Sequence, residues 1–238
     1  YMVMVLALAA AFLAYKVAAK RWVQWGIGAL GVGAFIALWA TYARAAALGA
    51  IVALGIVALV VYGKRISRAV WVALGITGLA LVGAVVVLYE TPFVSQVILH
   101  EDPNEGNAVN SNDGHAESLA DGATRMLRQP LGGGVGSTGS PSLLGDEPLI
   151  IENQYFYVAH EVGWVGLGLF LYISYQVLAQ AWRRRADWLS LAVFASGVGL
   201  MLIGIVLPVW ADDAVSIIWW GLAAVALASP LVKPARKQ

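Results

Sequence analysis

The side chains most able to do chemistry lie in one polar stretch, residues 91–152. Its only Lys or Arg residues are Arg125 and Arg128, and His115 is a further candidate for chemistry. Its nine acidic residues are Glu101, Asp102, Glu105, Asp113, Glu117, Asp121, Asp146, Glu147 and Glu152. A glycine-rich turn at 131–139 reads LGGGVGSTG. Backbone amides of such a turn, with Gly134 and Gly136 as candidates, can cradle an anion such as phosphate, although a flexible loop would have the same composition.

A second group of polar residues opens the apolar run 153–178. On a helix, one stripe of this run would contain Asn153, Tyr157, His160 and Trp164. Polar groups in an apolar span are costly, so we expect this stripe to face a helix bundle or a wet cavity. His160 and Glu161 would lie about two turns into the helix. They either hold helices together as a hydrogen-bonded pair or belong to a site.

The overall composition excludes most soluble classes of protein. Of the 238 residues, 60% are hydrophobic and 12% are charged, whereas a soluble domain has about 25% charged residues. The net charge of +1 argues against a nucleic-acid partner. With no cysteine there is no disulfide or thiol chemistry. The Asn- and Asp-rich stretch from Asp102 fails the EF-hand pattern at Gly106 and Asn107, so we expect no metal site and no cofactor.

Seven apolar runs are long enough, or nearly so, to cross a membrane as helices. They are 1–15, 22–43, 45–62, 69–90, 153–178, 188–208 and 214–231. Lys and Arg cluster at 16–21, 64–68, 183–185 and 233–237, which places all four clusters on one face, the cytoplasmic one. We therefore predict an all-α polytopic membrane protein of about seven transmembrane helices.

This arrangement divides the chain into three parts. Residues 1–90 form four transmembrane helices, residues 91–152 an extracytoplasmic loop, and residues 153–238 three further helices with a cytoplasmic tail. Within the loop, 101–115 is expected to be irregular and 116–128 to be a short amphipathic helix, with Leu119, Ala123, Met126 and Leu127 on one side. The charge pattern places Tyr1 on the extracytoplasmic side, and Tyr1 is not a start Met, so we expect earlier spans to precede it.

Two motifs of this chain together resemble the C-terminal half of the O-antigen ligase and O-antigen polymerase superfamily. The first is Gly114-His115, Leu119 and then RQPLGGGVGS at 128–137. The second is Glu152-Asn153, nine residues, and then GWVG at 163–166. The ligase pattern has Arg in place of His115 and His in place of Glu152, and the chain is similar instead to a variant with GH, PLGxGxG and ENxY. Family members have about twelve spans, with the large periplasmic loop before the last three.

The resemblance implies a reaction and a set of residues. The family moves a glycan from an undecaprenyl-diphosphate-linked donor to a sugar hydroxyl on a glycan or lipid acceptor, at the outer face of the bacterial cytoplasmic (inner) membrane. Such a transfer needs a base at the acceptor hydroxyl and donors on the leaving diphosphate. Glu152 or His115 would be the base. The diphosphate or sugar would be bound by Arg125, Arg128, Gly134, Gly136, Asn153, Gln154, His160 and Glu161.

Several alternatives stay open at this point. Arg125 and Arg128 have phosphate-binding guanidinium groups, but salt bridges to the many neighbouring acids would use them equally well. Glu152 could instead be a structural carboxylate, stabilised by the positive end of the dipole of the helix that follows it. A transporter or flippase for lipid-linked sugars would need ionisable residues in several spans, and a non-catalytic membrane scaffold would tolerate replacement of the site residues. Ligase and polymerase differ only in their acceptor.

Overall fold

The computed structural model describes residues 1–67, 69–70, 111–145 and 148–228, with side chains except at 111–117. The chain divides into two compact units, Tyr1–Val61 with Ser118–Gln238, and Tyr62–Glu117. The predicted span 69–90 lies outside the described residues apart from 69–70. So do residues 101–110 of the polar stretch.

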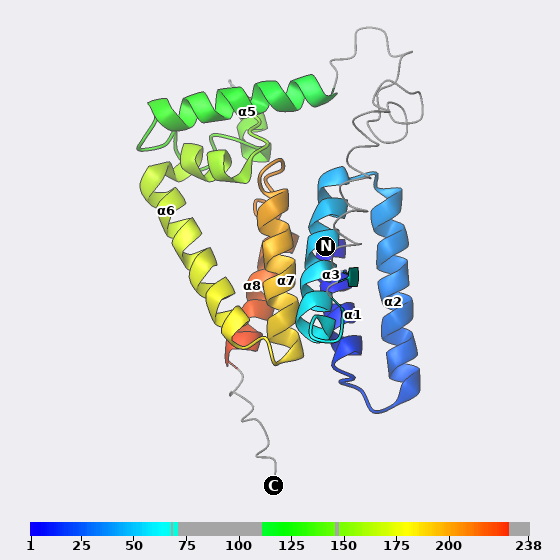
Figure 1. Cartoon of the computed structure of the whole chain (residues 1–238). Coiled ribbons are helices and arrows are strands. Elements are labelled where there is room, and N and C mark those ends of the chain that lie inside the picture. Colours follow the sequence, from blue (N-terminus) through cyan, green and yellow to red (C-terminus); the bar gives the residue numbers. More distant parts are fainter. Residues whose placement is uncertain (68, 71–110, 146–147, 229–238) are drawn as a thin grey trace, which may run out of the picture. The chain divides into compact units, whose positions relative to one another are not determined.

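The described residues form helices and no strands, as predicted (Figure 1). The apolar helices are α1 (Met2–Ala14), α2 (Arg21–Ala40), α3 (Arg44–Tyr62), α6 (Gln154–Arg183), α7 (Trp188–Ile203) and α8 (Asp213–Ala228). The polar stretch supplies α5 (Ser111–Arg128) and the 3-10 helix η2 (Ser140–Leu144). Helices α2, α3 and α6 are long and apolar enough to cross a membrane, and α1, α7 and α8 are apolar but shorter.

Helix α7 is central in the packing of the larger unit. It packs against α1, α6 and α8, and α1 also packs against α2. The core contains Leu191 and Leu200 of α7 and Trp219 of α8, all fully buried. Small residues such as Ala7 and Ala11 of α1 are equally buried. This is the pattern expected where helices approach closely through small residues.

Helices α3 and α7 meet at two glycines. A Cβ placed on Gly199 would lie 2.6 Å from the carbonyl oxygen of Gly49, and one on Gly49 would lie 2.6 Å from Cδ1 of Ile203. Gly199 has no room for a side chain, because the clash is with the backbone of Gly49, which cannot rotate away. A Cβ on Gly49 would meet the Ile203 side chain first and then Gly199 O at 3.0 Å. These glycines therefore set the distance between the two helices.

Helix α5 differs from the prediction at its start and on its surface. It begins at Ser111 rather than 116, so the last five residues of the predicted irregular segment are helical. The glycine at 114 is a weak helix former, costing about 1 kcal/mol, and it does not stop the helix. Leu127, predicted on the apolar side, is exposed.

The close approach of α3 and α7 gives a stability prediction. Gly199→Ala forces the two helices apart and should cost about 1–3 kcal/mol as an overpacking substitution, seen as a lower melting temperature of the purified protein in detergent. Gly55→Ala in α3 is the control, because a Cβ there meets nothing within 4 Å. Equal melting temperatures for the two variants would contradict this packing.

Candidate functional site

The site is organised by a break in α6 at Gly163 (Figure 1). Gly163 has φ 72° and ψ −175°, which are not helical values. In an unbroken helix the amide of Trp164 would donate to the carbonyl of His160. Here Trp164 N donates to Pro130 O at 2.9 Å, and Gly133 N donates to His160 O at 2.5 Å. The glycine-rich turn therefore enters the hydrogen-bond ladder of α6 and replaces one of its bonds with two.

Glycine is required on both sides of this contact. A Cβ on Gly163 would lie 2.6 Å from Pro130 O, and one on Gly132 would lie 2.7 Å from Gly163 N. Both residues also have positive φ, 72° and 84°, which side chains disfavour. The glycine-rich turn is thus a fixed turn held against α6. The predicted stripe of Asn153, Tyr157, His160 and Trp164 is interrupted. The non-helical backbone at Gly163 means that Trp164 no longer lies on the same helix face as His160.

The rest of the turn is held by further hydrogen bonds. The Thr138 hydroxyl donates to Leu149 O at 3.0 Å, and Gly139 N donates to the same oxygen at 2.9 Å. Gly136 N donates to the Glu161 carboxylate at 2.9 Å. The amide of Gly136, predicted for phosphate, therefore holds a carboxylate of this chain. The neighbouring Gly134 is exposed with φ 106°, and its amide has no partner within the described ranges.

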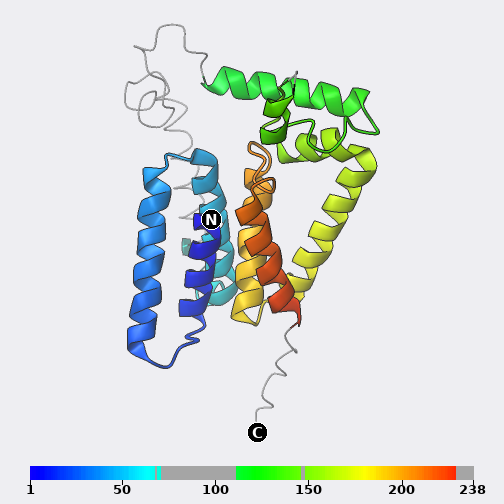
Figure 2. The ribbon, with the colours of Figure 1, turned by 180° about the vertical axis from the view of Figure 1, so that it is seen from behind.

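From Ser118 on, α5 lies along the first segment of α6, residues 154–162 (Figure 2). At one end Glu152 N donates to the Ser118 hydroxyl at 3.2 Å. In the middle a Cβ on Gly122 would meet Phe156 at 3.1 Å. At the other end Trp164 Nε1 donates to Met126 O at 2.7 Å. The two elements thus run parallel.

The charged groups on α5 differ in how far they are neutralised. Arg125 Nε pairs with Asp121 Oδ2 at 2.7 Å, and both side chains are partly exposed. The predicted alternative of a salt bridge is therefore realised at Arg125, although an exposed pair of this kind contributes only about 0–1 kcal/mol. Arg128 is exposed and has no hydrogen bond or ion pair to any residue that the structure describes. Arg128 is the more available cation for an anionic ligand.

Two buried polar atoms beside the turn lack partners. They are Nδ1 of His160 and Oε1 of Gln129, counted over the described part of the chain. His160 is 4% exposed, and its ring lies against Gly133, where a Cβ would be 3.1 Å from Nε2. The charges of Arg125 and Glu161 are within electrostatic range of this ring. Since buried polar atoms are normally hydrogen-bonded, these two mark a place for water or a ligand's polar group.

Gln129 was not predicted as a site residue. Its only sequence signal is its position directly before Pro130 in the first motif. The sequence does not show that Oε1 of Gln129 is buried without a hydrogen-bond partner, which only the folded structure reveals.

Asn153 and Gln154, predicted to bind substrate, are turned toward backbone groups instead. Asn153 caps α6, accepting from Tyr155 N at 2.9 Å, and donates from Nδ2 to Ile205 O at 2.6 Å. Gln154 accepts from Trp210 N at 2.7 Å. Both side chains are buried. Their contacts fasten the start of α6 to the connection between α7 and α8, which favours a positioning role for them.

The two predicted bases are placed on different elements. Glu152 directly precedes the cap of α6 and is half-buried. His115 lies on α5 one turn before Ser118, and its side chain is outside the described residues. Over the described ranges, no three His, Asp or Glu residues gather as metal ligands.

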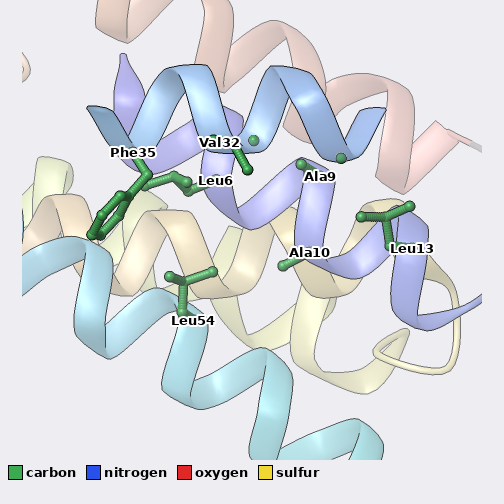
Figure 3. A pocket seen from close by; sticks show the side chains of 9 residues that line it. Leu6, Ala9, Ala10, Leu13, Val32, Phe35 and Leu54 are labelled. Carbon is green, nitrogen blue, oxygen red and sulfur yellow. The ribbon is translucent and has the colours of Figure 1, made fainter. Parts of the chain in front are cut away.

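An apolar hollow elsewhere in the unit is a poor candidate for the chemistry. It measures about 280 Å³ and lies among α1, α2 and α3 (Figure 3). Its lining residues include Leu6, Leu13, Phe35 and Leu54, and none is polar. None of the candidate site residues lines it.

The contacts of Asn153 allow a test of its role. Asn153→Ala removes a helix cap, worth about 1 kcal/mol, together with the bond to Ile205 O, and should lower the melting temperature in detergent. Asn153→Ser keeps a capping hydroxyl and should lose less. If the Ala variant melts like the parent, these contacts do not hold the start of α6 and the positioning role is wrong.

The break in α6 generates a second prediction. Gly163→Ala places a methyl group against Pro130 O in a backbone conformation that alanine disfavours. We expect the turn to leave α6, so that trypsin cleaves after Arg128 several-fold faster in detergent-solubilised protein. Gly168→Ala, at a site in α6 with nothing within 4 Å, should be cleaved at the parental rate. Equal rates for Gly163→Ala and the parent would refute the docking.

Comparison with known proteins identifies a family whose profile covers α5, the glycine-rich turn and the break in α6. Residues 29–171 match the profile of the family described as O-antigen ligase. That range is more than half of the chain and includes α5, the glycine-rich turn and the break in α6. No curated protein matches the chain significantly. The chain belongs to the O-antigen ligase family, and its role is membrane glycosyl transfer of the ligase or polymerase type.

Proposed function

We propose that this protein transfers or polymerises a glycan from an undecaprenyl-diphosphate-linked donor onto a sugar hydroxyl during assembly of a cell-surface polysaccharide. The observation that carries the proposal is the paired hydrogen bonding between the glycine-rich turn and α6. It joins both family motifs into one structure. Three kinds of group lie on adjoining elements of this structure. They are the Arg128 cation, which has no partner among the described residues, the buried unpaired atoms of His160 and Gln129, and the half-buried Glu152.

The proposed reaction is an inverting displacement at the anomeric carbon of the donor sugar. The acceptor hydroxyl oxygen forms the new glycosidic bond while the bond from that carbon to the diphosphate oxygen breaks. The hydroxyl proton passes to the base, and undecaprenyl diphosphate leaves with the electron pair. Glu152, at the mouth of α6, is the proposed base, either directly or by orienting His115 as the base.

The leaving diphosphate needs donors that strengthen as its charge develops. Arg128 is the proposed main contact of the diphosphate, because its guanidinium can bind two phosphate oxygens at once. It forms no ion pair with an acidic residue in the described structure. Arg125 would join it by exchanging Asp121 for a phosphate oxygen, at small cost because the pair is exposed. The amide of Gly134 is a further donor at the same turn.

His160 and Glu161 have a different proposed part. Glu161 holds the turn through Gly136 N, so it acts on the site by positioning the turn. His160, buried with an unpaired Nδ1 beside the turn, is proposed to bind a sugar hydroxyl directly or through water. These assignments need no metal ion or cofactor.

Membrane placement completes the proposal. Residues 91–152 lie on the extracytoplasmic side of the bacterial inner membrane, as the distribution of Lys and Arg favours. Donor and acceptor would meet there, and nucleic acid has no part. The alternatives of a lipid-linked-sugar transporter and a non-catalytic scaffold make different predictions for the same variants.

The decisive experiment is complementation of polysaccharide assembly in a deletion strain by the full-length gene. We expect Glu152→Gln, His115→Ala and Arg128→Ala, at matched membrane levels, to make no polymer and to accumulate undecaprenyl-linked glycan at the outer face of the membrane. Lys20→Ala, an exposed cation between α1 and α2, is the control and should complement fully.

Each other outcome contradicts the proposal in its own way. Accumulation of lipid-linked glycan on the cytoplasmic face would indicate a transporter. Normal complementation by all three variants would indicate a scaffold. If the variants accumulate lipid-linked glycan at the outer face, the protein is a transferase. The glycosidic linkage that their product lacks then distinguishes a polymerase from a ligase.

A further inference from the structure

Exposed apolar side chains gather around the break in α6. We call this set the bend patch: Leu127, Leu131, Val162, Trp164 and Val165. Leu131 is 90% exposed, Val165 75%, Leu127 66% and Trp164 50%. Isolated exposed apolar residues are ordinary, but a cluster of this kind usually marks a contact with a partner or a membrane.

The hydrogen bonds already described place these residues together. The indole of Trp164 donates to Met126 O, the neighbour of Leu127. The amide of Trp164 donates to Pro130 O, the neighbour of Leu131. A Cβ on Gly163 would lie 2.9 Å from Leu131 O. The patch therefore combines the end of α5, the start of the turn and both sides of the α6 break.

We propose that the bend patch is a lipid contact, by which the polar stretch is seated in the outer leaflet of the membrane. The first argument is continuity. Val165 lies at the start of the second segment of α6, and α6 as a whole (Gln154–Arg183) is a candidate span. Further exposed residues of this second segment include Leu169, Tyr172 and Ile173. An exposed apolar face of a span meets lipid, and the bend patch extends that face into the turn.

The second argument concerns charge and residue type. Arg128 follows Leu127 and is exposed, which suits a cation held near lipid phosphates with its alkyl chain against apolar surface. Trp164 stands at the first turn of the apolar segment, the position that tryptophan favours at membrane interfaces. Its indole N–H is already hydrogen-bonded, so burial of the ring in lipid leaves no unpaired donor there.

The lipid contact would serve the proposed function, although it does not depend on it. A polyprenyl-linked donor keeps its chain in the membrane and its diphosphate at the surface. A turn seated in the leaflet beside Leu131 holds Arg128 at the level of that diphosphate. The contact itself requires only that α6 crosses the membrane, whereas the choice of the outer leaflet rests on the orientation given under the proposed function.

The absence of cysteine from the chain makes a direct test possible. Single cysteines at Leu127→Cys, Leu131→Cys and Val165→Cys would carry a nitroxide spin label in the full-length protein, reconstituted in nanodiscs of phosphatidylethanolamine and phosphatidylglycerol. Relaxation by oxygen, which concentrates in lipid, is compared with relaxation by a water-soluble nickel chelate. Ser140→Cys is the control, since Ser140 is exposed at the start of η2, directly after the turn and beside the Gly139 that approaches Tyr157.

We expect the three patch labels to be more accessible to oxygen than to nickel, and the control label to show the reverse. Labels at the patch that resemble the control would overturn the lipid contact. Labels shielded from both reagents would overturn it in favour of a protein neighbour, such as a second copy. Because no glycan substrate is present, this result is independent of the complementation that tests the proposed function.

Discussion

One exchange of hydrogen bonds organises the described part of this protein. Helix α6 gives up the bond between Trp164 N and His160 O, and both groups pair instead with the turn at Pro130 and Gly133. A buried amide or carbonyl group left without a hydrogen bond would cost free energy. The break in α6 therefore requires the turn as its partner, and the turn requires the break. Beside this exchange lie the bond from Trp164 Nε1 to Met126 O of α5, the buried His160 and the exposed Leu131.

The sequence predicts the helices well because apolar runs of this length have few other structures in a membrane. Runs 22–43 and 45–62 became α2 and α3 within a few residues. The break at Gly163 was not predicted, because helical periodicity continues through a single glycine. Its signal was present only as a glycine in a family motif, and its cause is tertiary: Pro130 O occupies the space of a side chain.

Polar residues near the start of α6 show why the site is harder to predict than the fold. Asn153, Gln154, His160 and Glu161 all suggest function when an apolar run contains them. Asn153 and Gln154 contact the backbone at Ile205 and Trp210, more than fifty residues away in the chain, and no local pattern reveals such partners. His160 keeps an unpaired atom. The difference between a structural and a candidate functional polar residue therefore lies in which of its atoms the fold leaves unsatisfied.

The break also separates two environments within one helix. Before Gly163, α6 carries His160 and Glu161, which lie against the polar turn. After it, no charged residue occurs until Arg183. Because a charge in the hydrocarbon region is costly and the turn supplies polar partners, the last charged side chain and the start of the uncharged segment should fall on opposite sides of the membrane boundary. A helix break at that point lets the first segment turn along α5 while the second continues as a span. The same glycine thus separates the part of α6 that holds the polar turn from the uncharged part that is apolar enough for a span.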